Sequence, residues 1–121
     1  MDVQVPFPVI ADELGYVSRE LGMLHESKGS NTVRAVFIVD GAGILRLMMY
    51  YPQEVGRSVD EVLRALKALQ VSDENHVAMP ENWPNNAQFG DQVIIPPAGT
   101  EEAAAQRLAQ AEAGQYTCLD W

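Results

Sequence analysis

The chain has 121 residues, of which 47% are hydrophobic, and its formal net charge at pH 7 is −9. This size and composition are typical of one globular domain, or a piece of one, rather than of a disordered chain. The acidic balance disfavours nucleic acids and anionic membrane surfaces as partners, because both are bound mainly through lysine and arginine.

The first half of the chain predicts a short strand, a helix and a hairpin. Residues 5–10 are apolar apart from two prolines and suggest a short strand that enters a loop. Asp12 is a plausible N-cap, and apolar residues at helical spacing then continue to about Met23. Residues 33–39 predict a strand buried on both faces, and residues 44–51 predict the returning strand of a hairpin.

The second half predicts two capped helices joined by an arm. Residues 58–61 form a capping box in which Ser58 caps the amide of Glu61 and Glu61 reaches back, and the helix is expected to end near Leu69. Residues 73–99 are rich in proline and predict an extended arm with a short strand at 93–95. Thr100 is expected to cap a last helix that ends near residue 113, where Gly114 stops it.

The polar residues offer few candidates for chemistry. Arg34 lies near the start of an apolar strand and Arg57 just before a helix, and an arginine in such a place usually faces an anion because its burial is costly. As alternatives, Arg34 is an edge or ion-pair residue, and Arg57 binds Asp60 or Glu61. His25 and His76 stand apart without ligand spacing, so we expect no metal and no cofactor.

Cysteine content and the first residues bear on the compartment. Cys118 is the one cysteine, which excludes an internal disulfide and fits a reducing compartment or an intermolecular bridge. Residues 1–6 lack the basic start and apolar stretch of a signal peptide, and no apolar run approaches the roughly 20 residues of a membrane span. We therefore expect the cytoplasm and no membrane partner.

Several segments taken together resemble the later half of peroxiredoxins, thiol peroxidases of the thioredoxin-fold superfamily. The resemblance is to the one-cysteine class of eukaryotes and, more closely, to its archaeal relatives. The segments that carry it are Phe7-Pro8-Val9-Ile10-Ala11-Asp12, Leu21-Gly22-Met23-Leu24, Thr32 to Asp40, Tyr50-Tyr51-Pro52, Gly56-Arg57-Ser58-Val59-Asp60-Glu61, Pro80-Glu81-Asn82-Trp83-Pro84-Asn85, Ile95-Pro96-Pro97 and Tyr116-Thr117-Cys118-Leu119-Asp120-Trp121.

The resemblance implies an α/β fold, with the later half of a thioredoxin-like domain at residues 1–72 and an extended C-terminal dimerisation arm at residues 73–121. It implies a parent enzyme that reduces hydrogen peroxide and organic hydroperoxides through a cysteine thiolate, with a thiol as reductant. Arg34 would lower the pKa of that thiolate and donate hydrogen bonds to the peroxide oxygens, and Arg57 would belong to the same network.

The reactive cysteine and its proline-threonine surroundings are absent from this sequence. We therefore expect a fragment that is inactive alone and that associates with a second copy or with a complementary N-terminal half. Two alternatives stay open: a non-catalytic oligomerisation or regulatory module, and a redox sensor that acts through Cys118.

Overall fold

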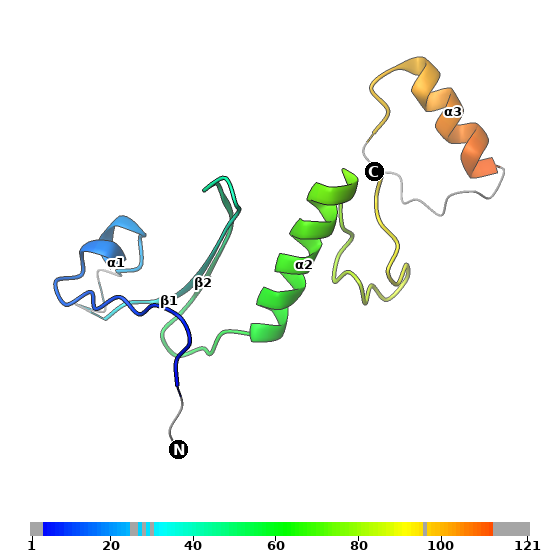
Figure 1. Ribbon diagram of the computed structural model, residues 1–121. Helices are drawn as coiled ribbons and strands as arrows, with labels where there is room; N and C mark the ends of the chain where they lie inside the picture. The colour runs from blue at the N-terminus through cyan, green and yellow to red at the C-terminus, as the bar shows by residue number, and fades with distance from the viewer. Residues whose placement is uncertain (1–3, 25–26, 28, 30, 96, 113–121) are drawn as a thin grey trace. The chain divides into compact units, whose positions relative to one another are not determined.

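The computed structural model describes residues 4–24, 27, 29, 31–95 and 97–112 (Figure 1). The elements in chain order are α1 (Tyr16–Glu20), β1 (Arg34–Val39), β2 (Leu45–Tyr51), α2 (Val59–Asn75) and α3 (Glu101–Glu112). They fall into two compact units, residues 1–57 and residues 58–121. In the described residues, no helix has the length and apolar character needed to cross a lipid bilayer.

The expected hairpin is confirmed. Strands β1 and β2 pair antiparallel, with Arg34 opposite Tyr51 and Ile38 opposite Leu47, and a bulge follows Ile38. The Asp40 carboxylate closes the turn by accepting hydrogen bonds from the backbone amides of Ala42, at 3.0 Å, and Ile44, at 2.9 Å. These bonds, the largest cause being the one from Ile44, hold the pKa of Asp40 below its usual value.

The two faces of the hairpin have different surroundings. Because side chains alternate along a strand, Arg34 shares one face with Met49 and Tyr51, whereas Phe37 and Tyr50 lie on the other. The Tyr50 hydroxyl donates a 2.6 Å hydrogen bond to the carbonyl of Leu21, and its ring meets Phe37 edge-on at 5.6 Å. The second face is therefore held to the α1 segment by the chain itself.

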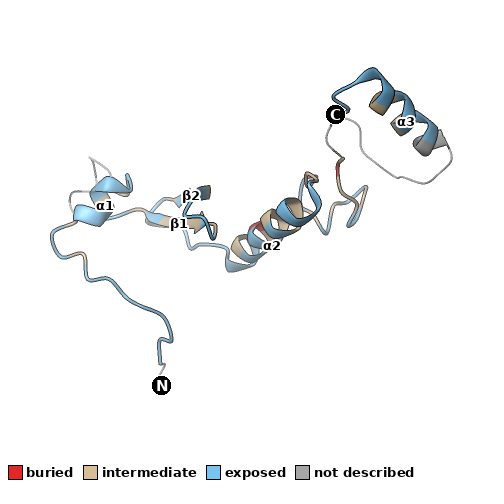
Figure 2. Ribbon diagram, turned by 45° about the horizontal axis from the view of Figure 1, so that its top comes forward, coloured by how far each residue is buried: buried red, intermediate tan, exposed pale blue. Residues whose placement is uncertain are grey.

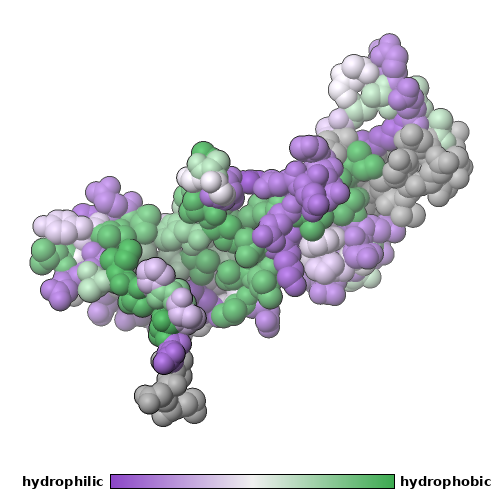
Figure 3. All heavy atoms as spheres, viewed as in Figure 1, coloured by the Kyte–Doolittle hydropathy of each residue, from purple (hydrophilic) through white to green (hydrophobic). Residues whose placement is uncertain are grey.

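The expectation that the first strand is buried on both faces is wrong. The four middle residues of β1 are half-buried and its two ends are exposed. The reason is that the described part of the chain forms a sheet of two strands only. Figure 3 shows hydrophobic residues at the surface of the first unit. Met48 of β2, for example, is 56% exposed.

The expected strand at residues 5–10 does not form either. The segment has no regular structure, and Phe7, Val9 and Ile10 are 66%, 76% and 75% exposed (Figure 2). Two prolines remove backbone donors from this stretch, and a strand needs a partner to pair with. No described residue provides such a partner.

Helix α1 is shorter than its apolar spacing predicts. Its N-cap is Gly15 in the left-handed region, with φ of 67°. Asp12 still serves the helix start, because its carboxylate accepts from the amides of Val17 and Ser18 at 3.2 and 2.9 Å and from the Ser18 hydroxyl at 2.7 Å. These bonds, led by the Ser18 hydroxyl, lower the pKa of Asp12.

Helix α2 confirms the capping serine but runs past its expected end. The Ser58 hydroxyl accepts from the Glu61 amide at 3.3 Å. The helix continues beyond Leu69 to Asn75, and His76 follows it in the left-handed conformation, with φ of 55°. The last turn is polar and mostly exposed, so apolar periodicity gave no signal for it.

The arm is not extended, which corrects the expectation for residues 73–99. After the Ser72 hydroxyl donates to the Val77 carbonyl at 2.6 Å, the chain folds back, and Ala78 and Ile94 exchange two backbone bonds of 2.8 Å. The expected strand at 93–95 is thus an isolated bridge. Ile94 is only 8% exposed, and Ala65 of α2 only 4%, so the second unit has a small core of its own.

Helix α3 begins as its sequence predicts. The Thr100 hydroxyl accepts from the Ala103 amide at 3.2 Å. The Arg107 guanidinium donates to the Ile95 carbonyl at 3.1 Å and so ties the helix to the end of the arm. The expected stop at Gly114 lies outside the described residues. In the structure, α2 belongs to the same compact unit as the arm. The domain boundary expected between residues 72 and 73 stays a prediction.

Candidate active-site arginines

Arg34 stands at the open end of the hairpin. It is the first residue of β1, its side chain is exposed, and the register places it opposite Tyr51. Its Nε donates a 2.9 Å hydrogen bond to the backbone carbonyl of Gln53. A guanidinium has five N–H donors, and the other four have no acceptor among the described residues. They form a fork that suits an anion or a polarised oxygen.

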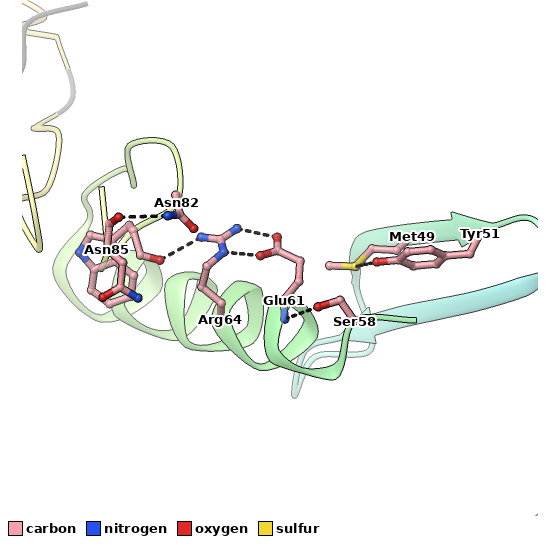
Figure 4. Close-up of polar contacts among 8 residues, drawn as sticks. Met49, Tyr51, Ser58, Glu61, Arg64, Asn82 and Asn85 are labelled. Carbon is pink, nitrogen blue, oxygen red and sulfur yellow. Dashed lines mark hydrogen bonds and ion pairs between the residues drawn. The ribbon is translucent and has the colours of Figure 1, made fainter. Parts of the chain in front are cut away.

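The Gln53 carbonyl belongs to a tight turn that follows β2. The Val55 amide donates to the Pro52 carbonyl at 3.0 Å and closes this turn. The closing bond uses the carbonyl of Pro52, so the carbonyl of Gln53 is available to Arg34. On the same face, the Tyr51 hydroxyl meets the Met49 sulfur at 3.9 Å, a weak contact (Figure 4).

Arg57 is exposed and directly precedes the Ser58 cap of α2. Its expected alternative partner Glu61 is bound by another arginine, because the carboxylate of Glu61 accepts from Arg64 at 2.6 Å and 2.8 Å (Figure 4). The role of Arg34 and Arg57 in one site stays a prediction.

Sequence reasoning missed Arg64, whose side chain makes three hydrogen bonds in the second unit. Besides its two bonds to Glu61, its Nη1 donates to the Trp83 carbonyl at 3.1 Å and so links α2 to the folded-back arm. The hydrogen bonds between the two side chains lower the pKa of Glu61 and raise the pKa of Arg64. The spacing of three residues between opposite charges on a helix was the available signal.

The neighbouring turn of the arm is held by its own side chains. Asn82 donates to the Asn85 carbonyl at 3.0 Å, and the Trp83 indole donates to the Asp91 carbonyl at 2.9 Å. Asn86 bonds both the Glu81 carbonyl and the amide of Phe89. Arg64 therefore binds a turn that its own hydrogen bonds already stabilise. We call the bonds of Arg64 to Glu61 and to the Trp83 carbonyl the Arg64 clamp.

The remaining candidates contribute no site. Cys118 and His25 lie outside the described residues. His76 ends α2 and is exposed. In the part of the chain that the structure describes, no group of three or more histidine, cysteine, aspartate or glutamate side chains is arranged to hold a metal ion.

Comparison with known families gives a match over residues 68–110, to the C-terminal domain of 1-Cys peroxiredoxin. The match begins inside α2 and ends inside α3. It therefore covers the folded-back arm together with Arg107 of α3, whereas Arg64 of α2 lies before it.

Relatives match over nearly the whole chain. A peroxiredoxin of Archaeoglobus fulgidus is 59% identical over all 121 residues, which span 56% of that protein. Peroxiredoxin 1 of Caldanaerobacter subterraneus subsp. tengcongensis is 61% identical over 119 residues, 98% of this chain and 55% of the relative. The chain thus spans about half the length of the curated relatives it matches.

Solved structures agree with these relatives. A yeast mitochondrial 1-Cys peroxiredoxin superposes with a TM-score of 0.70 at 36% identity, over 96% of this chain and 54% of that one. Peroxiredoxin 6 of Arenicola marina gives a TM-score of 0.70 at 33% identity, over 87% of this chain and 48% of that one.

Proposed function

Because the chain belongs to the peroxiredoxin family and matches the later half of its members, we propose that it supplies the peroxide-binding arginines of a thiol peroxidase. The reactive cysteine of such an enzyme is absent from this chain, which spans 56% of the Archaeoglobus fulgidus relative. The α/β fold class expected from the sequence is confirmed by the structural neighbours.

The reaction needs a positively charged hydrogen-bond donor beside the sulfur. The thiolate attacks one oxygen of the hydroperoxide, a sulfur–oxygen bond forms, the oxygen–oxygen bond breaks, and the leaving oxygen takes a proton. Sulfur is oxidised to a sulfenic acid, and the peroxide is reduced to an alcohol or water. Hydrogen bonds from Arg34 to the peroxide oxygens would stabilise the charge that moves onto the leaving oxygen.

The observation that supports this role is the state of the Arg34 side chain. Its Nε is anchored to the Gln53 carbonyl, whereas the rest of the guanidinium is exposed and has no acceptor among the described residues. An arginine that only stabilised the hairpin would direct its donors at the fold. Here one donor is bound to the chain and the others are exposed.

A chimera tests the proposal. In it, the parts of the Archaeoglobus fulgidus peroxiredoxin that this chain does not span are joined to the chain. The chimera should consume hydrogen peroxide with a thiol reductant, and Arg34→Lys should slow it because a point charge does not reproduce the guanidinium fork. Arg34→Met should cost more, roughly 100-fold or above, by analogy with the loss of one oriented donor.

The control is Arg19→Met, since Arg19 is also exposed and lies in the same unit. It should leave the rate unchanged. The 121-residue chain by itself should consume peroxide no faster than free cysteine. A normal rate for Arg34→Met in the chimera would refute the assignment.

The partners follow from the same proposal. The yeast relative is described by a thiol-resolving mechanism that works through glutathione/thioredoxin systems. We extend a thiol reductant to this protein. The cytoplasmic location that we propose rests instead on its single cysteine, which fits a reducing compartment. The exposed Phe7, Val9 and Ile10 favour a second copy or a complementary half as the covering partner. A compact monomer of the chain in light scattering would contradict this partner.

A further inference from the structure

The turn formed by residues 52–55, which we call the Pro52 turn, accepts a hydrogen bond from Arg34 through the backbone carbonyl of Gln53. We propose that this turn is a positioning element for peroxide reduction, acting through the Gln53 carbonyl. The inference rests on the proposed function of Arg34. It adds a second group, outside the arginines, on which the orientation of the peroxide donors depends.

The geometry of the bond explains how the turn acts. The bond joins Nε of Arg34 to the Gln53 carbonyl at 2.9 Å, the usual length of a strong N–H···O bond. Nε is the nitrogen through which the planar guanidinium joins the side-chain stem, so a bond there orients the whole planar group. The Nη donors, which have no acceptor among the described residues, remain as the part of the planar head that can bind the peroxide oxygens.

Strand pairing brings the turn and the arginine together. Arg34 is opposite Tyr51, and the turn starts at the next residue of the chain. The bond from the Val55 amide to the Pro52 carbonyl, at 3.0 Å, closes the turn and so sets the direction of the Gln53 carbonyl. Register and turn closure thus decide where the Gln53 carbonyl points, and the side chain of Gln53 has no part in it.

This origin predicts an unusual pattern of substitutions. Changing the side chain at residue 53 should leave peroxide reduction unchanged, because the acceptor is a main-chain oxygen. Changing the backbone at residue 55 should slow it, because the turn loses its closing N–H. A displacement of about 1 Å in a reacting group costs on the order of 100-fold in rate, so we expect a loss of roughly tenfold to 100-fold.

The test uses the chimera with three variants. Val55→Pro removes the amide that closes the turn, Val55→Ala keeps it, and Gln53→Ala removes the side chain only. Val55 is 46% exposed, so loss of its side chain should have a small effect. We expect a slowed reaction and faster hydrogen exchange at the Arg34 Nε–H, followed by ¹⁵N NMR, in Val55→Pro alone.

A double-mutant cycle separates positioning from general damage. In an Arg34→Met background, Val55→Pro should slow the reaction no further, because the group that the turn positions is gone. An additional loss of the same size as in the wild-type background would overturn the proposal, as would wild-type rate and exchange in Val55→Pro. A normal rate for Arg34→Met alone would instead refute the proposed function.

A second variant covers the case in which Val55→Pro does not fold. Replacing Glu54 by its α-hydroxy analogue turns the Gln53 carbonyl into an ester, which is a weaker acceptor and keeps every side chain. The same faster exchange at the Arg34 Nε–H and the same slower reaction are expected. Unchanged exchange and rate in the ester variant would reject the positioning role.

Discussion

The Arg64 clamp gives the sharpest prediction about the stability of the second unit. Arg64→Met keeps a long, unbranched side chain but removes two hydrogen bonds to Glu61 and one to the Trp83 carbonyl. The side chains of Arg64 and Glu61 are 25% and 41% exposed, so the pair itself should contribute only about 0.3–0.5 kcal/mol. The part-buried, charge-assisted bond to the carbonyl should contribute about 1.5 kcal/mol.

The expected total is about 2 kcal/mol of the free energy of unfolding. For a small unit with a urea m-value of about 2 kcal/mol/M, the midpoint should fall by about 1 M with the m-value unchanged. Trp121→Phe in every protein leaves Trp83 as the single tryptophan, so its fluorescence reports on the arm. Glu61→Gln should cost less than Arg64→Met, because the bond to Trp83 remains.

Arg19→Met serves again as the control and should leave the midpoint in place. If Arg64→Met shifted the midpoint no more than Arg19→Met, the clamp would have no measurable part in holding the arm. Hydrogen exchange at the Trp83 indole gives an independent check, because its bond to the Asp91 carbonyl depends on the same turn.

The remaining predictions concern pH, a helix cap and the hairpin. Arg64 lowers the pKa of Glu61 in the folded state, so the ion pair contributes its full stabilisation above the unfolded glutamate pKa of about 4.3. This stabilisation is lost as the pH falls through the lower folded pKa. The difference in urea midpoint between wild type and Glu61→Gln should therefore close on acidification from pH 6 towards about pH 3. Ser58→Ala should cost about 1 kcal/mol in thermal unfolding, and Ser58→Gly less. Asp40→Ala should speed amide exchange in the hairpin turn, whereas Asp40→Asn, which keeps an acceptor oxygen, should do so less. Tyr50→Phe should lose about 1 kcal/mol with its bond to the Leu21 carbonyl, and equal urea midpoints would contradict it.

Features with a local cause were predictable from the sequence. The hairpin follows from a β-rich run on each side of an Asp-Gly turn, and the caps at Ser58 and Thr100 follow from hydroxyls placed before helical spacing. The resemblance led to Arg34, and the structure places its guanidinium at the exposed hairpin end. In each case the residues that decide the outcome are close neighbours in the chain.

Features that depend on distant contacts were missed. Residues 5–10 have the composition of a strand, but a strand also needs a partner strand. The sequence of one segment does not show whether such a partner is present. The folding back of the arm depends on Ile94 meeting Ala78 and on Arg64 reaching Trp83, which are 19 residues apart. Arg34 is bound by a backbone carbonyl, and every residue has one, so the sequence could not identify Gln53 as its partner.

The paired ends of the hairpin also limit how the sequence can change in length. Between Ile38 and Leu47 the chain forms a bulge and an Asp40-centred turn, and beyond them the pairing is regular to Arg34 and Tyr51. Deleting one residue from the turn would slide one strand past the other and carry Arg34 away from Tyr51 and the Pro52 turn. Homologous genes should therefore tolerate substitutions in this loop, such as at Ala42, far better than single-codon insertions or deletions.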